Sequence, residues 1–187
     1  MAEKPLKHIP DEAPFGRGLV QIFTGEGKGK TSAALGTVVR ALGQNLKVCI
    51  IVFMKGNYPY SEWNFLSRFP EVRIERFGLN KFTDRENPDP EAIAEAKKAL
   101  AAAREATLSG QYSVIVLDEV NIATAWRLVE PDEVVRLIRE KPQEVELILT
   151  GRYADDRLIQ LADMVTECKK IKHPYDEGVK ARKGLDY

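Results

Sequence analysis

Residues 24–31 read Thr-Gly-Glu-Gly-Lys-Gly-Lys-Thr, and they stand between a short apolar run and a helical pattern. A glycine-rich loop in this strand–loop–helix context is typical of a phosphate-binding loop. Its glycines let consecutive backbone N–H groups turn towards a phosphate chain, the start of the helix adds partial positive charge, and Lys30 adds a full one. The Thr31 hydroxyl is suited to ligate Mg²⁺. Thr24 stands where the common form of the motif has its first glycine.

Short apolar runs rich in Val and Ile recur along the rest of the chain. They lie at residues 19–23, 48–54, 72–74, 114–117, 145–149 and 164–165. Because these runs are continuous rather than alternating, they predict strands that are buried on both faces, as in a parallel sheet.

Helical patterns fill the intervals between the apolar runs. They lie at residues 30–42, 89–108, 130–142 and from residue 155 onward. Asp89 and Asp155 are suitable N-caps, and Pro90 stands at a first helical position. The alternation predicts a three-layer α/β fold like that of P-loop NTPases, in which helices cover both faces of a mostly parallel sheet of about six strands.

Length and composition indicate one cytoplasmic domain. The chain has 187 residues, a formal net charge of zero and two cysteines, Cys49 and Cys168. A generic nucleic-acid binder would be strongly basic, and a bilayer span needs about 18–20 consecutive apolar residues, which no stretch approaches. Two cysteines form no disulfide framework, which favours a reducing cytoplasm. We therefore expect no nucleic acid and no membrane as partners.

Three segments do not fit the strand–helix alternation. Residues 1–17 are polar and contain prolines, and they predict a flexible arm ahead of a single domain at residues 18–187. The irregular stretch at residues 77–88 and the basic tail at residues 171–187 are long enough to be functional loops. Both are therefore candidates for a binding site.

An acidic pair follows the apolar run at residues 114–117. Asp118 and Glu119 stand where a buried strand ends, which is where a carboxylate reaches the metal beside a phosphate loop. Together with the loop, this pair predicts a site for Mg²⁺ and a nucleoside triphosphate. No guanine-reading Asn/Thr-Lys-x-Asp motif occurs, so ATP is favoured over GTP.

The residues alone leave two functional classes open beside group transfer. The first is a P-loop ATPase in which Glu119 activates water as general base. The second is a protein that binds ATP or another ligand as a carrier or sensor and turns nothing over. Product analysis separates these classes, because hydrolysis gives ADP and phosphate.

Further blocks match one family in their order along the chain. They are Val20-Gln-Ile-Phe-Thr-Gly-Glu-Gly-Lys-Gly-Lys-Thr-Ser-Ala-Ala-Leu-Gly, Phe53-Met-Lys-Gly, Val116-Leu-Asp-Glu-Val, Leu149-Thr-Gly-Arg, Lys172-His-Pro-Tyr and Gly178-Val-Lys-Ala-Arg-Lys-Gly-Leu-Asp-Tyr. With them, the chain resembles the corrinoid adenosyltransferases of the CobA/BtuR type from about residue 18 to its end.

The resemblance implies a reaction in which the Co(I) of a corrinoid attacks the 5′ carbon of ATP and triphosphate leaves. The corrinoid would be cobalamin, cobinamide or cobyrinic acid a,c-diamide, in adenosylcobalamin biosynthesis or salvage. Co(I) is itself a strong nucleophile, so this chemistry needs no general base. In this family ATP lies along the loop in the direction opposite to that in P-loop hydrolases. The resemblance also implies a reductant such as a flavoprotein, and a homodimer.

By the same resemblance, site residues carry over onto matching positions. The nucleotide or corrinoid contacts are Thr24, Gly25, Glu26, Gly27, Lys28, Gly29, Lys30, Thr31, Ser32, Arg40, Arg152, Lys180 and Arg182, and the metal ligands are Thr31, Asp118 and Glu119. The catalytic set is Lys30, Thr31, Glu119 and Phe82. Glu26 replaces the Asn common in this loop.

The resemblance also concerns the loop at residues 77–88. Phe82 aligns with the Phe of a Phe-Thr-Trp element that helps to remove the lower axial ligand of cobalt. Asp84 stands at the Trp position, so half of this aromatic device is absent. Phe77, Trp63 and Tyr58 are candidates to compensate for the missing Trp.

Overall fold

The computed structural model describes residues 16–56, 58–81 and 83–186. Six parallel strands form one sheet in the order β3-β2-β4-β5-β1-β6. Their bounds are β1 Val20–Thr24, β2 Val48–Val52, β3 Val72–Arg76, β4 Val114–Asp118, β5 Glu146–Thr150 and β6 Met164–Glu167. Each predicted apolar run is a strand, and the sheet is parallel throughout.

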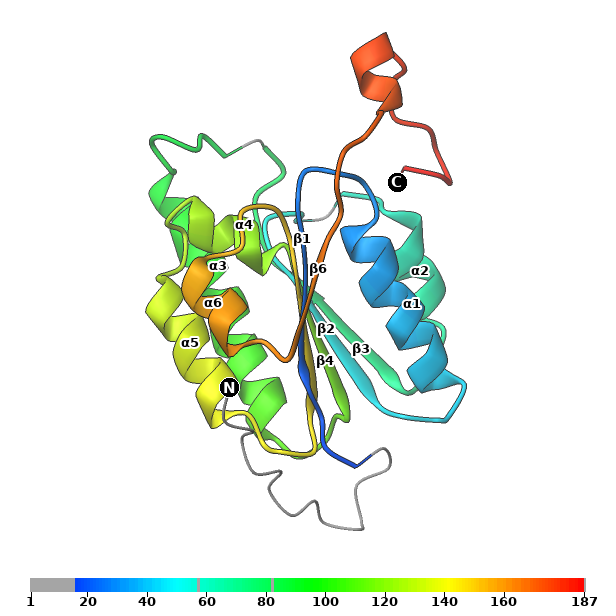
Figure 1. Cartoon of the computed structure of the whole chain (residues 1–187), viewed down its shortest axis with the longest axis vertical. Coiled ribbons are helices and arrows are strands. Elements are labelled where there is room, and N and C mark those ends of the chain that lie inside the picture. The colour runs from blue at the N-terminus through cyan, green and yellow to red at the C-terminus, as the bar shows by residue number, and fades with distance from the viewer. Residues whose placement is uncertain (1–15, 57, 82, 187) are drawn as a thin grey trace, which may run out of the picture.

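Helices cover both faces of this sheet (Figure 1). Helices α1 and α2 lie on one face, and α3, α4, α5 and α6 lie on the other. Their bounds are α1 Lys30–Leu42, α2 Ser61–Leu66, α3 Pro90–Leu108, α4 Val120–Ala125, α5 Pro131–Glu140 and α6 Asp156–Leu161, with a 3-10 turn at Pro174–Glu177. The predicted three-layer α/β fold of the P-loop NTPase kind is confirmed.

The inner strands are buried because their side chains supply two cores. In β2, Cys49 and Ile51 pack under α3 and its neighbours, whereas Ile50 and Val52 pack under α1 and α2. All residues of β2, β4 and β5 are buried. This explains why their apolar runs are continuous, since both faces of a strand need apolar side chains when helices cover both.

Two local features differ from the sequence-based expectation. The short helices α2 and α4 were not predicted, because six residues are too few to establish a helical period and neither helix has a capping side chain like the Asp155 that precedes α6. The last apolar run forms β6, but as the edge strand of the sheet it is exposed along its whole length rather than buried on both faces.

The carboxyl ends of the parallel strands share one edge of the sheet. There β4 ends at Asp118, next to the end of β2 at Val52, and β1 leads into residues 25–29 and α1. The chain leaves β6 at the same edge and continues above it as the tail (Figure 1). Ligands of such sheets bind at this edge.

The two cysteines are free, as predicted. Cys49 lies in the core of β2, where burial raises the pKa of its thiol to about 12. Among the described residues, no helix is both long and apolar enough to cross a membrane.

Candidate active site

The phosphate loop delivers the start of α1 to the sheet edge with its backbone donors open. Gly29 precedes the helix with φ 120° and has no side chain to cap it, and no acidic residue lies in the first turn. The first N–H groups of a helix have no partner within it. They therefore form a ready site for an anion.

Lys30 lies across this loop. Its Nζ donates to the Gly27 carbonyl oxygen at 2.6 Å. Burial lowers the pKa of Lys30, while the nearby Glu119 carboxylate opposes that effect. The ammonium is thus held over the phosphate loop by a hydrogen bond to a neutral carbonyl. A phosphate oxygen, which is negatively charged, would be a stronger acceptor and could replace it.

Main-chain contacts with the segment that follows β6 explain why Gly27 must be a glycine. Its N–H donates to the Cys168 carbonyl at 2.6 Å, and the Cys168 N–H donates to the Thr24 carbonyl at 2.7 Å. A Cβ on Gly27 would lie 2.7 Å from the Cys168 oxygen and from the Lys169 carbonyl carbon. The loop therefore rests directly on this segment.

Thr24, which replaces the first glycine of the common motif, has a contact of its own. Its hydroxyl accepts a hydrogen bond from the Ala154 N–H at 3.3 Å. The side chain thereby connects the phosphate loop to the turn that follows β5.

Asp118 lies beneath the cavity rather than on its wall, because it is fully buried and satisfied. Its Oδ1 accepts hydrogen bonds from the hydroxyls of Thr31 at 2.9 Å and Thr150 at 2.7 Å, and its Oδ2 accepts one from Lys55 at 2.6 Å. Because the Thr31 hydroxyl donates its hydrogen to Asp118, the lone pairs of its oxygen remain available to a ligand in the cavity.

Glu119 is the carboxylate that reaches the cavity. Its backbone is left-handed, with φ 64°, and its N–H donates to the Thr150 hydroxyl. Its Oε1 lies 3.3 Å from the Lys55 ammonium, and its buried Oε2 has no hydrogen-bond partner within the described parts of the chain. Burial raises the pKa of Glu119, against the opposing effect of Lys55.

These oxygen atoms fit Mg²⁺. The Thr31 oxygen and the orphaned Oε2 of Glu119 are hard ligands, and Mg²⁺ is usually held by one or two carboxylates together with substrate phosphates rather than by an all-protein cage. Residues 16–56, 58–81 and 83–186 contain no cluster of three or more His, Cys, Asp or Glu side chains that could hold a metal ion.

Lys55 is a site residue that sequence reasoning missed. It follows β2, and its ammonium contacts both carboxylates and lies 5.1 Å from the centre of the Tyr60 ring. Burial lowers its pKa, but Asp118 and Glu119 more than offset this, so the pKa of Lys55 lies above its ordinary value. The signal in the sequence was a lysine directly after a buried apolar run.

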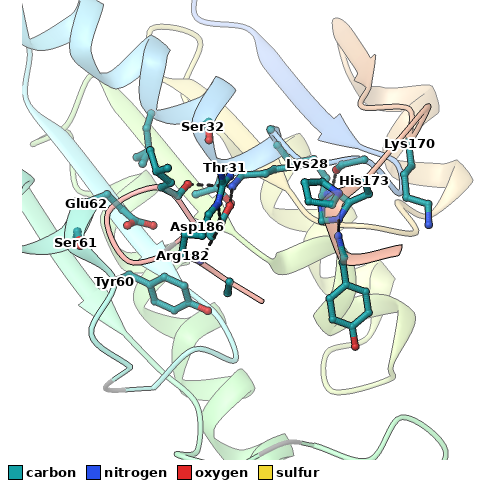
Figure 2. A pocket seen from close by; sticks show the side chains of 18 of the residues that line it. Lys28, Thr31, Ser32, Tyr60, Ser61, Glu62, Lys170, His173, Arg182 and Asp186 are labelled. Carbon is teal, nitrogen blue, oxygen red and sulfur yellow. Dashed lines mark hydrogen bonds and ion pairs between the residues drawn. The ribbon is translucent and has the colours of Figure 1, made fainter. Parts of the chain in front are cut away.

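A cavity of about 970 Å³ is lined both by Thr31, Lys55 and Glu119 and by residues of the tail (Figure 2). This volume lies in the range of small-molecule sites, about 300–1,000 Å³. Of the predicted site residues, its walls contain Gly27, Lys28, Gly29, Lys30, Thr31, Ser32, Glu119, Arg152, Lys180 and Arg182.

The remaining predicted residues lie elsewhere. Thr24 ends β1, Gly25 and Glu26 begin the loop, and none of the three lines the cavity, while Asp118 lies beneath the wall. Arg40 is exposed in the last turn of α1, ten residues or roughly 15 Å along the helix from Lys30. Phe82 lies outside the described residues.

Three cations of the cavity wall are paired with acids, one of which, Asp186, sequence reasoning did not single out. Lys28 pairs with Asp186 of the tail and donates to the Leu185 carbonyl at 2.9 Å, and Asp186 also accepts from Arg182 (Figure 2). Arg152 lies 3.3 Å from Glu26, so the acid that replaces the loop Asn has a partner.

The aromatic candidates for the missing Trp separate by burial. Trp63 is 3% exposed within the core under α2, and Phe77 packs against the opposite core. Tyr58 is exposed and contacts Tyr60, with ring centres 4.8 Å apart, and Tyr60 lines the cavity. Trp63 is therefore a core residue, and Tyr58 contacts Tyr60, which lines the cavity together with Phe65 and Tyr175.

Comparison with known proteins gives a consistent result. The family described as ATP:corrinoid adenosyltransferase BtuR/CobO/CobP matches residues 16–187. The corrinoid adenosyltransferase of Escherichia coli K12 is 36% identical over 176 residues, which cover 91% of this chain and 86% of that protein. The corrinoid adenosyltransferase of Pseudomonas aeruginosa is 36% identical over 171 residues, covering 91% and 84%. The corrinoid adenosyltransferase CobA of Salmonella typhimurium is 34% identical over 176 residues, covering 91% and 86%.

Proposed function

Because this chain belongs to the ATP:corrinoid adenosyltransferase family, we propose that it transfers the 5′-deoxyadenosyl group of ATP to the Co(I) of a corrinoid. Cobalt supplies the electron pair of the new cobalt–carbon bond, the C5′–oxygen bond breaks, and triphosphate leaves with the electrons of that bond. The observation that carries this proposal is the single cavity shared by the phosphate loop, Thr31 and Glu119.

The chain's own groups stabilise the leaving triphosphate. In the proposed reaction, the open N–H groups at the start of α1 and the Lys30 ammonium would contact the triphosphate, on which negative charge grows as the C5′–oxygen bond breaks. Donors that are already in place cost no reorganisation during the reaction, which makes such electrostatic stabilisation effective. Arg152, Lys180 and Arg182 add positive charge at the mouth of the cavity.

The Thr31 oxygen and the Glu119 carboxylate would hold Mg²⁺, and Asp118 would orient the Thr31 hydroxyl. When bound, the metal supplies charge neutralisation of the phosphates.

We extend the proposal to the partners. The corrinoid, whether cobalamin, cobinamide or cobyrinic acid a,c-diamide, would contact the cavity mouth. A cytoplasmic reductant such as a flavoprotein would supply Co(I), and the enzyme would act as a homodimer in adenosylcobalamin biosynthesis or salvage.

The experiment is a product analysis under anaerobic conditions. The protein is incubated with ATP, Mg²⁺ and chemically reduced cobalamin or cobinamide, and the expected result is the spectrum of a cobalt–carbon product together with one triphosphate per product. ADP and phosphate would indicate an ATPase with Glu119 as general base. Binding without turnover would indicate a carrier, and either result would overturn the proposal.

A further inference from the structure

Lys55 is held in the site by a strained turn. Met54 has φ 63°, a left-handed conformation that is costly for a side chain other than glycine. The turn packs against Gly78, where a Cβ would lie 2.7 Å from the Met54 main chain, and the Gly56 N–H donates to the Phe77 carbonyl at 3.2 Å. The packing of this turn against residues 77–78 therefore fixes the position of the Lys55 backbone and the direction in which its side chain leaves it.

The ammonium of Lys55 lies between two carboxylates. It is 2.6 Å from Asp118 Oδ2 and 3.3 Å from Glu119 Oε1, and its side chain is only 14% exposed. Charges interact far more strongly in such a site than at the surface. Lys55 is thus the cation in direct contact with both members of this acidic pair.

The metal would have to enter beside this ammonium. The orphaned Glu119 Oε2 belongs to the same carboxylate whose other oxygen faces Lys55. In the deep part of the cavity, Asp118 and Glu119 carry two negative charges, and Lys30 and Lys55 carry two positive ones. A divalent cation that arrives alone adds unbalanced positive charge, whereas one that arrives on a triphosphate brings its own negative charge.

We propose that Lys55 is a resident counter-cation that occupies the carboxylate pair until nucleotide arrives, so that the protein takes up a divalent metal only together with a triphosphate. This role rests on the proposed function, because it assigns the same cavity to the metal and ATP. Lys55 acts through Asp118 and Glu119, and it is therefore a positioning residue.

The test measures the binding of Mn²⁺ alone, followed by electron paramagnetic resonance of the free ion, with no nucleotide present. Lys55→Met removes the charge but keeps most of the chain length, and it is expected to bind Mn²⁺ at least tenfold more tightly than the wild type. Lys55→Arg keeps the charge and is expected to bind Mn²⁺ as weakly as the wild type.

A matched control is Lys28→Met, which removes one positive charge from the wall of the same cavity. The Lys28 side chain is 48% exposed and pairs with the tail, so solvent screens its effect on the carboxylates. We expect its Mn²⁺ affinity to change by less than about threefold. An equal gain of Mn²⁺ affinity in Lys55→Met and Lys28→Met would show that the loss of any positive charge from the cavity has this effect, and it would overturn the specific role of Lys55.

A stability measurement guards against a simple folding defect. Lys55→Met leaves two buried carboxylates facing each other, and Mn²⁺ should therefore raise its melting temperature more than that of the wild type. Unchanged Mn²⁺ affinity and an unchanged response of the melting temperature would overturn the inference. The transfer assay is read separately, since wild-type protein that makes no cobalt–carbon product contradicts the proposed function whatever Lys55 does.

Discussion

The cavity has two walls that differ in how they are held. The buried wall is formed by Lys30, Thr31, Lys55 and Glu119 together with Asp118, which lies directly beneath them, and all five stand at or near the ends of elements packed into the core. The tail wall consists of residues 168–186. Its side chains are mostly exposed, and its ion pairs are in contact with solvent. One site thus joins a rigid charge network to a segment with almost no core of its own.

Breaking an ion pair in the buried wall therefore lowers the free energy of unfolding more than breaking an ion pair in the tail wall. Breaking a buried pair leaves an uncompensated charge and costs about 3–5 kcal/mol. Exposed pairs such as Lys172–Glu177 typically contribute about 0.2–1 kcal/mol. Ile171 is 91% exposed and Leu185 is 66% exposed, so apolar burial adds little to the tail.

The largest effect is expected at the centre of the buried wall. Asp118→Ala removes the acceptor for Thr31, Thr150 and Lys55 and leaves that lysine with only the longer contact to Glu119, so the free energy of unfolding should fall by about 3–5 kcal/mol. Urea denaturation measures the loss. In the double variant Asp118→Ala/Lys55→Met, part of the stability should return. A loss below 1 kcal/mol in the single variant would place this pair with the surface pairs of the tail.

The next effect concerns catalysis. Lys30→Ala should slow adenosyl transfer by at least about 10²–10³-fold, the usual cost of losing one donor to developing charge, with the fold intact. Lys28→Ala is the matched control, since Lys28 lies two residues earlier in the same loop but pairs with the tail. Its rate should fall by less than tenfold. Comparable losses in the two variants would erase the distinction between the walls.

A smaller effect is expected where the two walls touch. Gly27→Ala places a methyl group against the main chain of Cys168 and Lys169, which cannot yield as a side chain would, and should cost about 1–3 kcal/mol of stability. Gly36→Ala lies within α1 with no atom within 4 Å of the new Cβ, and it should stabilise by roughly 0.5–1 kcal/mol. Thermal unfolding measures both. Two changes of the same sign would argue against the close contact.

The smallest effect is expected at the end of the tail. Asp186→Asn removes the partner of Lys28 and Arg182, so stability should change by less than about 1 kcal/mol. Because Lys28 then loses its ion pair and keeps only the hydrogen bond to the Leu185 carbonyl, its charge is more available to a phosphate, and ATP should bind about two- to fivefold more tightly at low salt, with the gain fading as salt is raised. Titration calorimetry at two salt concentrations measures the difference. A destabilisation above 2 kcal/mol would show that the tail is held as firmly as the buried wall.

Much of the buried wall could be predicted from local sequence. The glycines and Lys30 of the phosphate loop, and Asp118 and Glu119 after an apolar run, have positions set by a strand, a turn and a helix that follow one another closely. The sequence did not show which of the two acids, Asp118 or Glu119, reaches the cavity. Only the packing of Thr150 and Lys55 around Asp118 shows that this carboxylate is saturated while Glu119 reaches the cavity.

The tail could be predicted only as a basic segment with candidate cations. Lys180 and Arg182 do line the cavity, whereas Arg40, inferred by the same resemblance, lies at the far end of α1. Asp186 was not singled out because an acid in a basic tail has no local pattern that reveals its partner. Lys28, which it contacts, is 158 residues away in the chain.

The sequence by itself determined the fold class, the phosphate loop and the acidic pair, because periodicity and backbone conformation are encoded by neighbouring residues. The tertiary structure alone decided that Lys55 meets Asp118 and that the tail reaches the loop. The first contact requires β2 to lie beside β4, and the second requires β6 to lie beside β1. Strand order is a property of the whole sheet, since it follows from how all helices and strands bury their apolar faces together.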